Sequence, residues 1–233
     1  VGAGKTAAMI IAAHEARRTG RVHGTSMFAV PGNMVEQFAR DYLRLYPQAR
    51  VLSPRETDKD GVREFAARAA TGDFDAVVCS HNVLKAIPLH PDTQAAQLRD
   101  RISELTGGDL AETLDRRGQR ALQKRISKLN AQLTALTEAA VDPEATYFDR
   151  IGVGMLFVDE AHLAKNIALA TERKGLPMPD PSQLAEAVLA RADIVRAANG
   201  PGAVVMATAT PVTNSPAEMW VAARLVAPNA IAK

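Results

Sequence analysis

The chain lacks long apolar runs and has very little cysteine. No stretch of about 18 uninterrupted apolar residues is present, and no basic region followed by an apolar run stands at the N-terminus, so we expect neither a membrane span nor a secretory signal. The single cysteine, Cys79, excludes an internal disulfide, and its place in the apolar run 76–79 predicts a small buried hydrophobe rather than a nucleophile. These absences favour a cytoplasmic protein with no membrane partner.

Neither sign of charge dominates the sequence. Its 28 Lys and Arg residues and 26 Asp and Glu residues leave a net charge of +2, which permits a nucleic-acid partner without demanding one. Any basic surface must therefore be local. The chain also has no internal repeat and no low-complexity tract, and its length of 233 residues predicts one α/β domain with room for one insertion.

Five short apolar runs alternate with helical patterns along the chain. Several of the runs are near-continuous, as in strands that are buried on both faces of a parallel sheet. This alternation predicts an α/β fold with a mostly parallel sheet flanked by helices. We expect strands at 26–30, 50–52, 76–80, 155–158 and 203–207. We expect helices at 6–18, 33–46, 62–70, 182–198 and 215–226.

Residues 92–145 interrupt this alternation, because no strand is expected there. Two groups of apolar side chains follow one another at alternating spacings of four and three residues, with a helix break at Gly107 and Gly108. We therefore expect a single domain over 1–233 that contains an inserted helical hairpin. Packing against the sheet and contact with phosphate both stay open as roles of this hairpin. The apolar side chains are Leu98, Ile102, Leu105, Leu122, Ile126, Leu129, Leu133 and Leu136. The basic side chains that could meet phosphate are Arg116, Arg117, Arg120, Lys124, Arg125 and Lys128.

The chain opens with the second half of a phosphate-binding loop, which runs directly into a helical pattern. Glycines let backbone N–H groups turn toward phosphate oxygens, Lys5 can reach the β- and γ-phosphates of ATP, and the Thr6 hydroxyl can bind Mg²⁺. The first glycine of the full motif and the strand that feeds it would precede Val1, so this match is partial. The residues expected to bind ATP are Gly2, Ala3, Gly4, Lys5 and Thr6.

A second signal is an apolar strand at 155–158 that ends in two adjacent carboxylates. A parallel strand delivers the residues at its carboxyl end into a ligand crevice, so Asp159 can hold Mg²⁺ while Glu160 polarises the attacking water. Such a pair can also simply cap the next helix. The phosphate-binding loop in the same chain favours the catalytic interpretation.

A third signal is the apolar strand at 203–207, which ends in hydroxyl residues and a proline. Thr208 and Thr210 could hydrogen-bond toward the carboxylate pair and sense the γ-phosphate. Strand-end threonines are commonly only turn formers, so this signal gains its weight from the other two. Ser215 with Glu218 predicts a capping box at the start of the last helix.

With these residues in place, the chain resembles the first RecA-like lobe of superfamily 2 helicases, with GAGKT as motif I, DEAH as motif II and ATATP as motif III. The run ATATPVTNSPAEMW is similar to the end of this lobe in Swi/Snf-type translocases. The run PGNMVEQFARDYLRLYP matches the place of the segment that contacts the tracked strand in that family. The stretch FDRIGVGMLFVDEAHLAKN resembles large bacterial and phage helicases that often sit beside an adenine-methyltransferase domain.

This resemblance implies an ATP- and Mg²⁺-dependent helicase or double-stranded DNA translocase, in which Lys5, Asp159 and Glu160 are catalytic. Its implied partners are nucleic acid, DNA more than RNA, a second RecA-like lobe in the same full-length chain and, in some settings, a methyltransferase domain. An isolated lobe would not complete the cycle, because the arginine finger of the missing half contributes about 10³ to 10⁵ in rate. The residues implied to couple hydrolysis to movement are His162, Thr208 and Thr210. The residues implied to grip the tracked strand are Pro31, Gly32, Asn33, Ser80, His81 and Asn82.

Two other functions stay open. One is a degenerate or ATP-gated interaction module of a mobile-element or phage protein. The other is a P-loop ATPase of a different division, such as a small-molecule kinase, although DEAH followed by a Thr-x-Thr-Pro strand has no obvious role there. Ala209 also departs from the glycine that many helicase relatives carry in the third motif.

Overall fold

A computed structural model describes residues 4–107, 116–138, 140–164, 182–210 and 223–226. The chain divides into two compact units. The first consists of Val1–Pro88, Thr146–Ile167 and Pro179–Lys233, and the second of Leu89–Ala145 and Ala168–Met178. Among the described residues, the structure contains no helix that is both long and apolar enough to cross a membrane.

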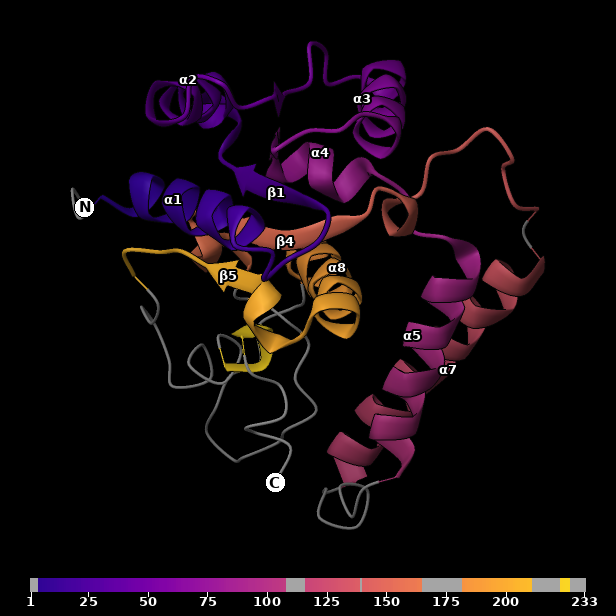
Figure 1. The fold of residues 1–233 in the computed structure, drawn as a ribbon. Coiled ribbons are helices and arrows are strands. Elements are labelled where there is room, and N and C mark those ends of the chain that lie inside the picture. Colours follow the sequence, from indigo (N-terminus) through magenta and orange to yellow (C-terminus); the bar gives the residue numbers. More distant parts are fainter. Residues whose placement is uncertain (1–3, 108–115, 139, 165–181, 211–222, 227–233) are drawn as a thin grey trace. The chain divides into compact units, whose positions relative to one another are not determined.

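The described part of the first unit is built on a five-stranded sheet in the order β2-β3-β1-β4-β5, and every neighbouring pair is parallel (Figure 1). All five expected strands are present with small shifts in their bounds, and the predicted α/β fold with a parallel sheet is confirmed. The strands are β1 (Thr25–Val30), β2 (Val51–Leu52), β3 (Ala76–Ser80), β4 (Val153–Val158) and β5 (Val204–Met206).

Helices cover both faces of this sheet, which explains why every residue of β1, β3 and β4 is buried. On one face, Phe28 stacks on Phe157 and packs against Phe38, in a core that also includes residues of α1 and α2. On the other face, α4 and α8 contact strands β1, β3 and β4. The helices of this unit are α1 (Lys5–Arg18), α2 (Val35–Leu45), α3 (Lys59–Thr71), α4 (His81–Ala86) and α8 (Gln183–Asn199).

Three details depart from the expected elements or extend them. The short helix α4 was not expected from the sequence, and the helix predicted at 33–46 is a 3₁₀ turn over Gly32–Met34 followed by α2. Residues 223–226 are helical, while the rest of the helix predicted at 215–226, with its capping box, lies outside the described residues.

Cys79 is fully buried, which confirms its expected role as a small buried hydrophobe, and burial raises the pKa of its thiol to about 12.

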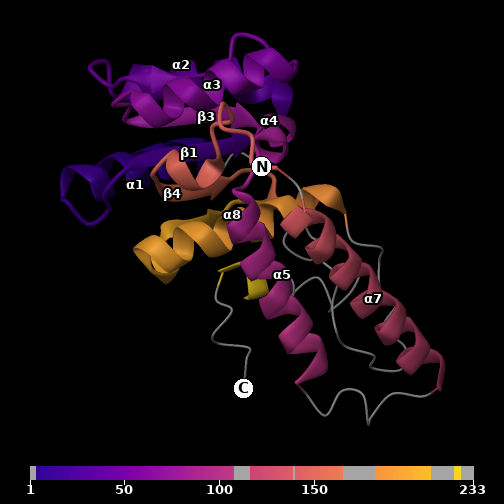
Figure 2. The ribbon, with the colours of Figure 1, turned by 90° about the vertical axis from the view of Figure 1, so that its right-hand side faces the viewer.

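The second unit contains α5 (Pro91–Thr106) and α7 (Arg116–Glu138), which pack against each other. They lie side by side in both ribbon views (Figures 1 and 2). The His90 ring accepts a hydrogen bond from the backbone N–H of Asp92 at the start of α5, and this helix ends before Gly107. Leu105 and Leu129 are buried, whereas the other members of the apolar seam are half-buried.

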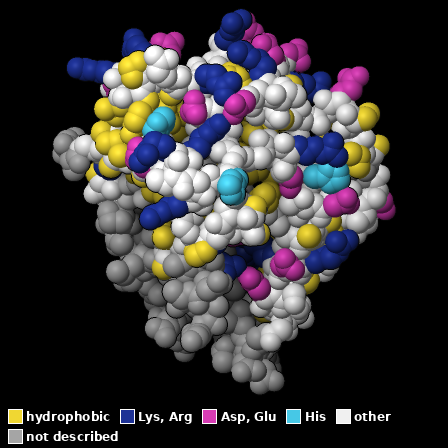
Figure 3. All heavy atoms as spheres, viewed as in Figure 1, with side chains coloured by type: hydrophobic (Ala, Val, Ile, Leu, Met, Phe, Trp, Pro, Cys, Tyr) yellow, Lys and Arg dark blue, Asp and Glu magenta, His cyan; other side chains and the backbone are white. Residues whose placement is uncertain are grey.

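Charged side chains of both signs lie interspersed over the face shown in Figure 3, in keeping with the small net charge. On α7, Arg120, Lys124 and Lys128 are exposed. Their spacing of four residues places them on one side of the helix.

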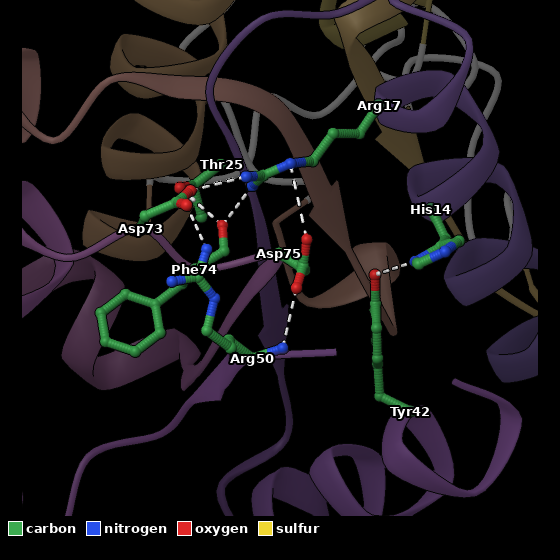
Figure 4. A network of polar contacts seen from close by, with 8 residues as sticks. All are labelled: His14, Arg17, Thr25, Tyr42, Arg50, Asp73, Phe74 and Asp75. Atoms are coloured by element: carbon green, nitrogen blue, oxygen red, sulfur yellow. Dashed lines mark hydrogen bonds and ion pairs between the residues drawn. The ribbon is translucent and has the colours of Figure 1, made fainter. Parts of the chain in front are cut away.

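A polar network fixes the end of α1 that is farthest from Lys5 (Figure 4). The Arg17 guanidinium donates to the Phe74 carbonyl and to Asp73 Oδ1, the latter at 2.7 Å, and pairs with Asp75 Oδ1 at 3.5 Å. The Arg50 backbone N–H donates to Asp75 Oδ2 at 2.8 Å, and its guanidinium pairs with Asp73. Hydrogen bonds from Arg50 and Arg17 lower the pKa of the Asp73 carboxyl. These contacts tie the carboxyl end of α1 to the segment that enters β3.

Candidate functional site

The first part of the site is the N-terminus of α1. Gly4 precedes the helix with φ 71° and ψ 22°, a left-handed conformation that favours glycine. Among the described residues, no side chain caps this helix, and its first turn has no acidic residue. The first backbone N–H groups therefore remain available to an anion, which the positive end of the helix dipole also attracts. Lys5 and Thr6 are the first two residues of the helix, whereas Gly2 and Ala3 lie outside the described residues.

The second part is the carboxyl end of β4. The Asp159 backbone N–H donates to the Ala29 carbonyl at 2.9 Å, so the ladder with β1 continues to this residue. Asp159 is only 8% exposed, and its Oδ1 has no hydrogen-bond partner among the described residues. Glu160 has φ 47°, a left-handed conformation that costs a residue with a side chain roughly 1–2 kcal/mol. The chain therefore turns sharply between the two carboxylates.

These two parts meet, although they are far apart in the sequence. Lys5 Nζ lies 3.8 Å from Glu160 Oε1. His162 Nδ1 lies 3.2 Å from Glu160 Oε2 and 3.2 Å from Thr208 Oγ1, which follows β5. The side chains of Lys5, Glu160 and His162 are about one-third exposed, so these pairs contribute little to stability. Their importance is that one continuous line of contacts joins all three sequence motifs.

Thr210 takes part in these contacts only through its backbone. Its N–H donates to Thr208 Oγ1 at 3.1 Å, while the Thr210 residue itself is exposed. The backbone of β4 and the segment after β5 are also joined, because the Ala161 N–H donates to the Ala207 carbonyl at 2.9 Å and the Ala207 N–H to Val158 at 2.8 Å. The third motif is thus held beside the second by main-chain bonds.

The donor atoms at this place fit a magnesium ion held together with phosphate. Mg²⁺ in nucleotide sites binds through one or two protein oxygens, phosphate oxygens and water. Asp159 offers a buried carboxylate oxygen that has no partner among the described residues, an arrangement that is costly unless a cation or a donor reaches it. Thr6, at the start of α1, carries the hydroxyl expected from the sequence.

A second group of predicted residues lies at the carboxyl ends of β1 and β3. These strands are neighbours in the sheet, with Val30 opposite Ser80, and a Cβ added to Gly32 would lie 3.9 Å from the Ser80 side chain. The turns 31–33 and 80–82 therefore lie side by side. Gly32, Asn33 and Asn82 are exposed, and we call these three residues the strand-end surface.

Ser80 and His81 point inward instead. Ser80 is 8% exposed, and its Oγ accepts the Val83 N–H at 3.1 Å, which caps α4. His81 is 7% exposed, and its Nε2 lies 2.9 Å from the Asp159 carbonyl oxygen. Burial lowers the pKa of His81, while the hydrogen bond to Asp159 opposes this shift. The sequence contains no signal for this contact, because the partner of the imidazole is a backbone carbonyl rather than a side chain.

Two hollows of the described surface lie away from these groups. One of about 190 Å³ is lined by Ser53, Arg55 and Arg68 beyond β2 and along α3. Another of about 330 Å³ is lined by His23, Phe148 and neighbouring residues before β1 and β4. Neither of these two hollows includes Lys5, Asp159 or Glu160.

Comparisons with known proteins give one family. The model of a family described as "Probable helicase domain" matches residues 1–233. A search of curated proteins finds no match to this chain.

Proposed function

Because the chain belongs to this family of helicase domains, we propose that it is the ATP-binding lobe of an ATP-dependent nucleic-acid helicase or double-stranded DNA translocase. The observation that carries the proposal is the approach of Lys5 Nζ to Glu160 Oε1 at 3.8 Å. It brings a phosphate-binding lysine and a strand-end carboxylate pair to one edge of a parallel sheet, where α/β proteins bind their ligands.

The proposed chemistry is attack of water on the γ-phosphorus of ATP. The N–H groups at the start of α1 and Lys5 would hold the phosphates, and Thr6 with Asp159 would hold Mg²⁺, which neutralises charge on the phosphate oxygens. Glu160 would orient the attacking water and accept its proton. A bond from the water oxygen to phosphorus forms as the bond to the bridging oxygen of ADP breaks, which yields ADP and phosphate.

Coupling to nucleic acid is the second part of the proposal. His162 contacts both Glu160 and Thr208 at 3.2 Å, so a change around the γ-phosphate would alter the segment after β5. The exposed amides and backbone of the strand-end surface offer neutral donors suited to the phosphates of a tracked strand. Double-stranded DNA is favoured over RNA by the resemblance to Swi/Snf-type translocases.

Hydrolysis would need a second RecA-like lobe that closes over this edge of the sheet and supplies an arginine finger, worth about 10³ to 10⁵ in rate. The residues at this edge would form one side of such a cleft. A methyltransferase domain beside the motor is a further proposed neighbour, based on the resemblance of the segment around DEAH.

The test is the ATPase rate of the full-length protein with and without nucleic acid. We expect hydrolysis that nucleic acid stimulates and that Lys5→Ala or Glu160→Gln abolishes. Lys59→Ala and Glu64→Gln are matched controls, because both side chains are exposed on α3, outside the segment 31–47. Equal hydrolysis with and without DNA or RNA would instead favour an ATP-gated interaction module.

A further inference from the structure

The peptide group between Asp159 and Glu160 determines where both carboxylates point. Its nitrogen belongs to Glu160, whose φ of 47° lies in the left-handed region. Its carbonyl oxygen belongs to Asp159 and faces His81 Nε2 at 2.9 Å. The ψ angle of Asp159 and the φ angle of Glu160, on either side of this peptide, set how the two side chains point relative to each other, and a left-handed residue persists only where its surroundings hold it.

The imidazole of His81 contacts this peptide and helps to fix its orientation. A carbonyl oxygen can only accept a hydrogen bond, so the proton of this contact is on Nε2 of the ring. The ring is itself fixed, because His81 is 7% exposed and is the first residue of α4, directly after the capping residue Ser80. The donor therefore reaches the peptide from a helix whose start is fixed by its own cap.

His81 also lies next to the strand-end surface. The residue after it, Asn82, is exposed, and the residue before it, Ser80, lies beside Gly32. A displacement of the first turn of α4 would move the imidazole and, through it, the peptide that carries the two carboxylates. No other residue of the strand-end turns 31–33 and 80–82 is recorded in a side-chain hydrogen bond to Asp159 or Glu160 among the described residues.

We propose that His81 is a positioning residue, which holds the Asp159–Glu160 peptide in its catalytic orientation and links that orientation to occupancy of the strand-end surface. The inference rests on the proposed function, since it assigns His81 to the ATP reaction and not to direct contact with nucleic acid. It predicts that the Nε2 donor matters for turnover, while ATP binding depends on Lys5 and the start of α1.

Two substitutions separate the donor from the volume of the ring. His81→Leu keeps a buried side chain of similar size without a donor, and His81→Gln keeps an amide N–H near the place of Nε2. In the full-length protein with saturating nucleic acid, we expect His81→Leu to lower kcat about 10-fold to 100-fold, as loss of an outer-shell partner does at comparable sites. We expect its KM for ATP to stay within about 2-fold, its stimulation by nucleic acid to fall, and His81→Gln to keep most of the activity.

A role in folding alone would give a different result. A folded His81→Leu protein with wild-type kcat and wild-type stimulation would overturn the proposal, and so would equal losses of kcat in the Leu and Gln proteins. Thermal unfolding by circular dichroism shows whether each variant is folded.

A measurement on the wild-type protein covers the case in which His81→Leu does not fold. ¹⁵N NMR of the His81 ring should show the proton on Nε2, and a ring protonated only on Nδ1 would refute the bond. Absence of any ATPase activity in the wild-type protein would refute the proposed function. The NMR measurement would still test the hydrogen bond between His81 Nε2 and the Asp159 carbonyl.

Discussion

The two compact units bring their residues together in different ways. In the first unit, Lys5, Glu160 and Thr208 come from three distant segments and meet only because parallel strands place their carboxyl ends on one edge of the sheet. In the second unit, the packing is between α5 and α7, which are near each other in the chain. The first arrangement depends on the whole sheet, and the second depends on a repeated apolar seam.

This difference predicts where substitutions are tolerated. A site assembled from distant segments is sensitive to any change that shifts one strand end, such as the contact between His81 and Asp159. A helical pair with half-buried seam residues keeps its form when exposed side chains change, because surface substitutions usually alter stability by less than about 0.5 kcal/mol. We therefore expect the substitutions that lower ATP hydrolysis to lie in the first unit.

The largest expected effect is at the meeting point of the first unit. Lys5→Ala and Glu160→Gln should each lower kcat for ATP at least about 10²-fold to 10³-fold, the usual cost of losing a group that stabilises transition-state charge. Because the two groups act on one reaction, the double variant should be little worse than either single one. Steady-state ATPase assays of the full-length protein measure this, and simple multiplication of the two losses would show that the groups act independently.

A smaller effect is expected from a buried cation that serves the fold. Arg191 on α8 is 4% exposed, donates to the Ile87 and Lys85 carbonyls, and lies over the Phe148 ring at 5.5 Å. Burial lowers its pKa to about 10. Arg191→Leu would leave buried acceptors without donors and should destabilise the first unit by about 3 kcal/mol.

Hydrogen–deuterium exchange can locate this loss. Exchange should rise in β3, β4 and α8 and stay unchanged in α5 and α7 if the two units unfold independently. Arg44→Leu, at an exposed position of α2, is the matched control. An equal rise in both units would show that they unfold together.

The sequence predicted the sheet well because its strands carry local signals. The apolar runs at 26–30, 76–80 and 155–158 are visible without any knowledge of their neighbours, and each became a fully buried strand. The meeting of Lys5 with Glu160 was also expected, since motif order and parallel pairing imply it. The short helix α4 was missed, because six residues that directly follow a strand give too brief a periodic pattern to recognise.

The contact of His81 could not be predicted for a different physical reason. Its partner is the backbone carbonyl of Asp159, and a carbonyl group has no residue identity that a sequence could reveal. The register between β3, β1 and β4 places the two groups together. The resemblance to helicases therefore assigned His81 to the nucleic-acid surface, whereas its imidazole is buried and contacts the Asp159 carbonyl.

The hypothesis that α7 contacts phosphate predicts a modest effect on nucleic-acid binding. Replacing the exposed residues Arg120, Lys124 and Lys128 by Gln should weaken binding and lower the slope of log affinity against log salt, by up to about 0.9 for each lost contact with B-DNA. ATP affinity should not change. Fluorescence anisotropy at several salt concentrations measures both the affinity for nucleic acid and its salt slope. An unchanged slope would remove the hypothesis and favour a helical pair that only packs.

A matched control distinguishes a local contact from a general loss of charge. Gln at the exposed positions Arg21, Arg55 and Lys59, which lie outside the segment 31–47, removes the same number of positive charges from the first unit. If this variant changes the salt slope as much as the α7 variant, binding responds to net charge and not to α7.

The smallest expected effect comes from removing α5 and α7 altogether. The segments that flank them meet in the first unit, because the Phe148 N–H donates to the Pro88 carbonyl at 2.8 Å. A short Gly/Ser linker in place of 89–145 should therefore leave the sheet paired and the affinity for ATP within about 2-fold of wild type, since loop closure costs little extra free energy. Titration with a fluorescent ATP analogue measures this affinity. Lys5→Ala in the same shortened protein should strongly weaken binding, which would show that the retained signal comes from the start of α1. Loss of ATP binding on removal of 89–145 alone would mean that the second unit supports the site of the first, and that the contrast between the two units is wrong.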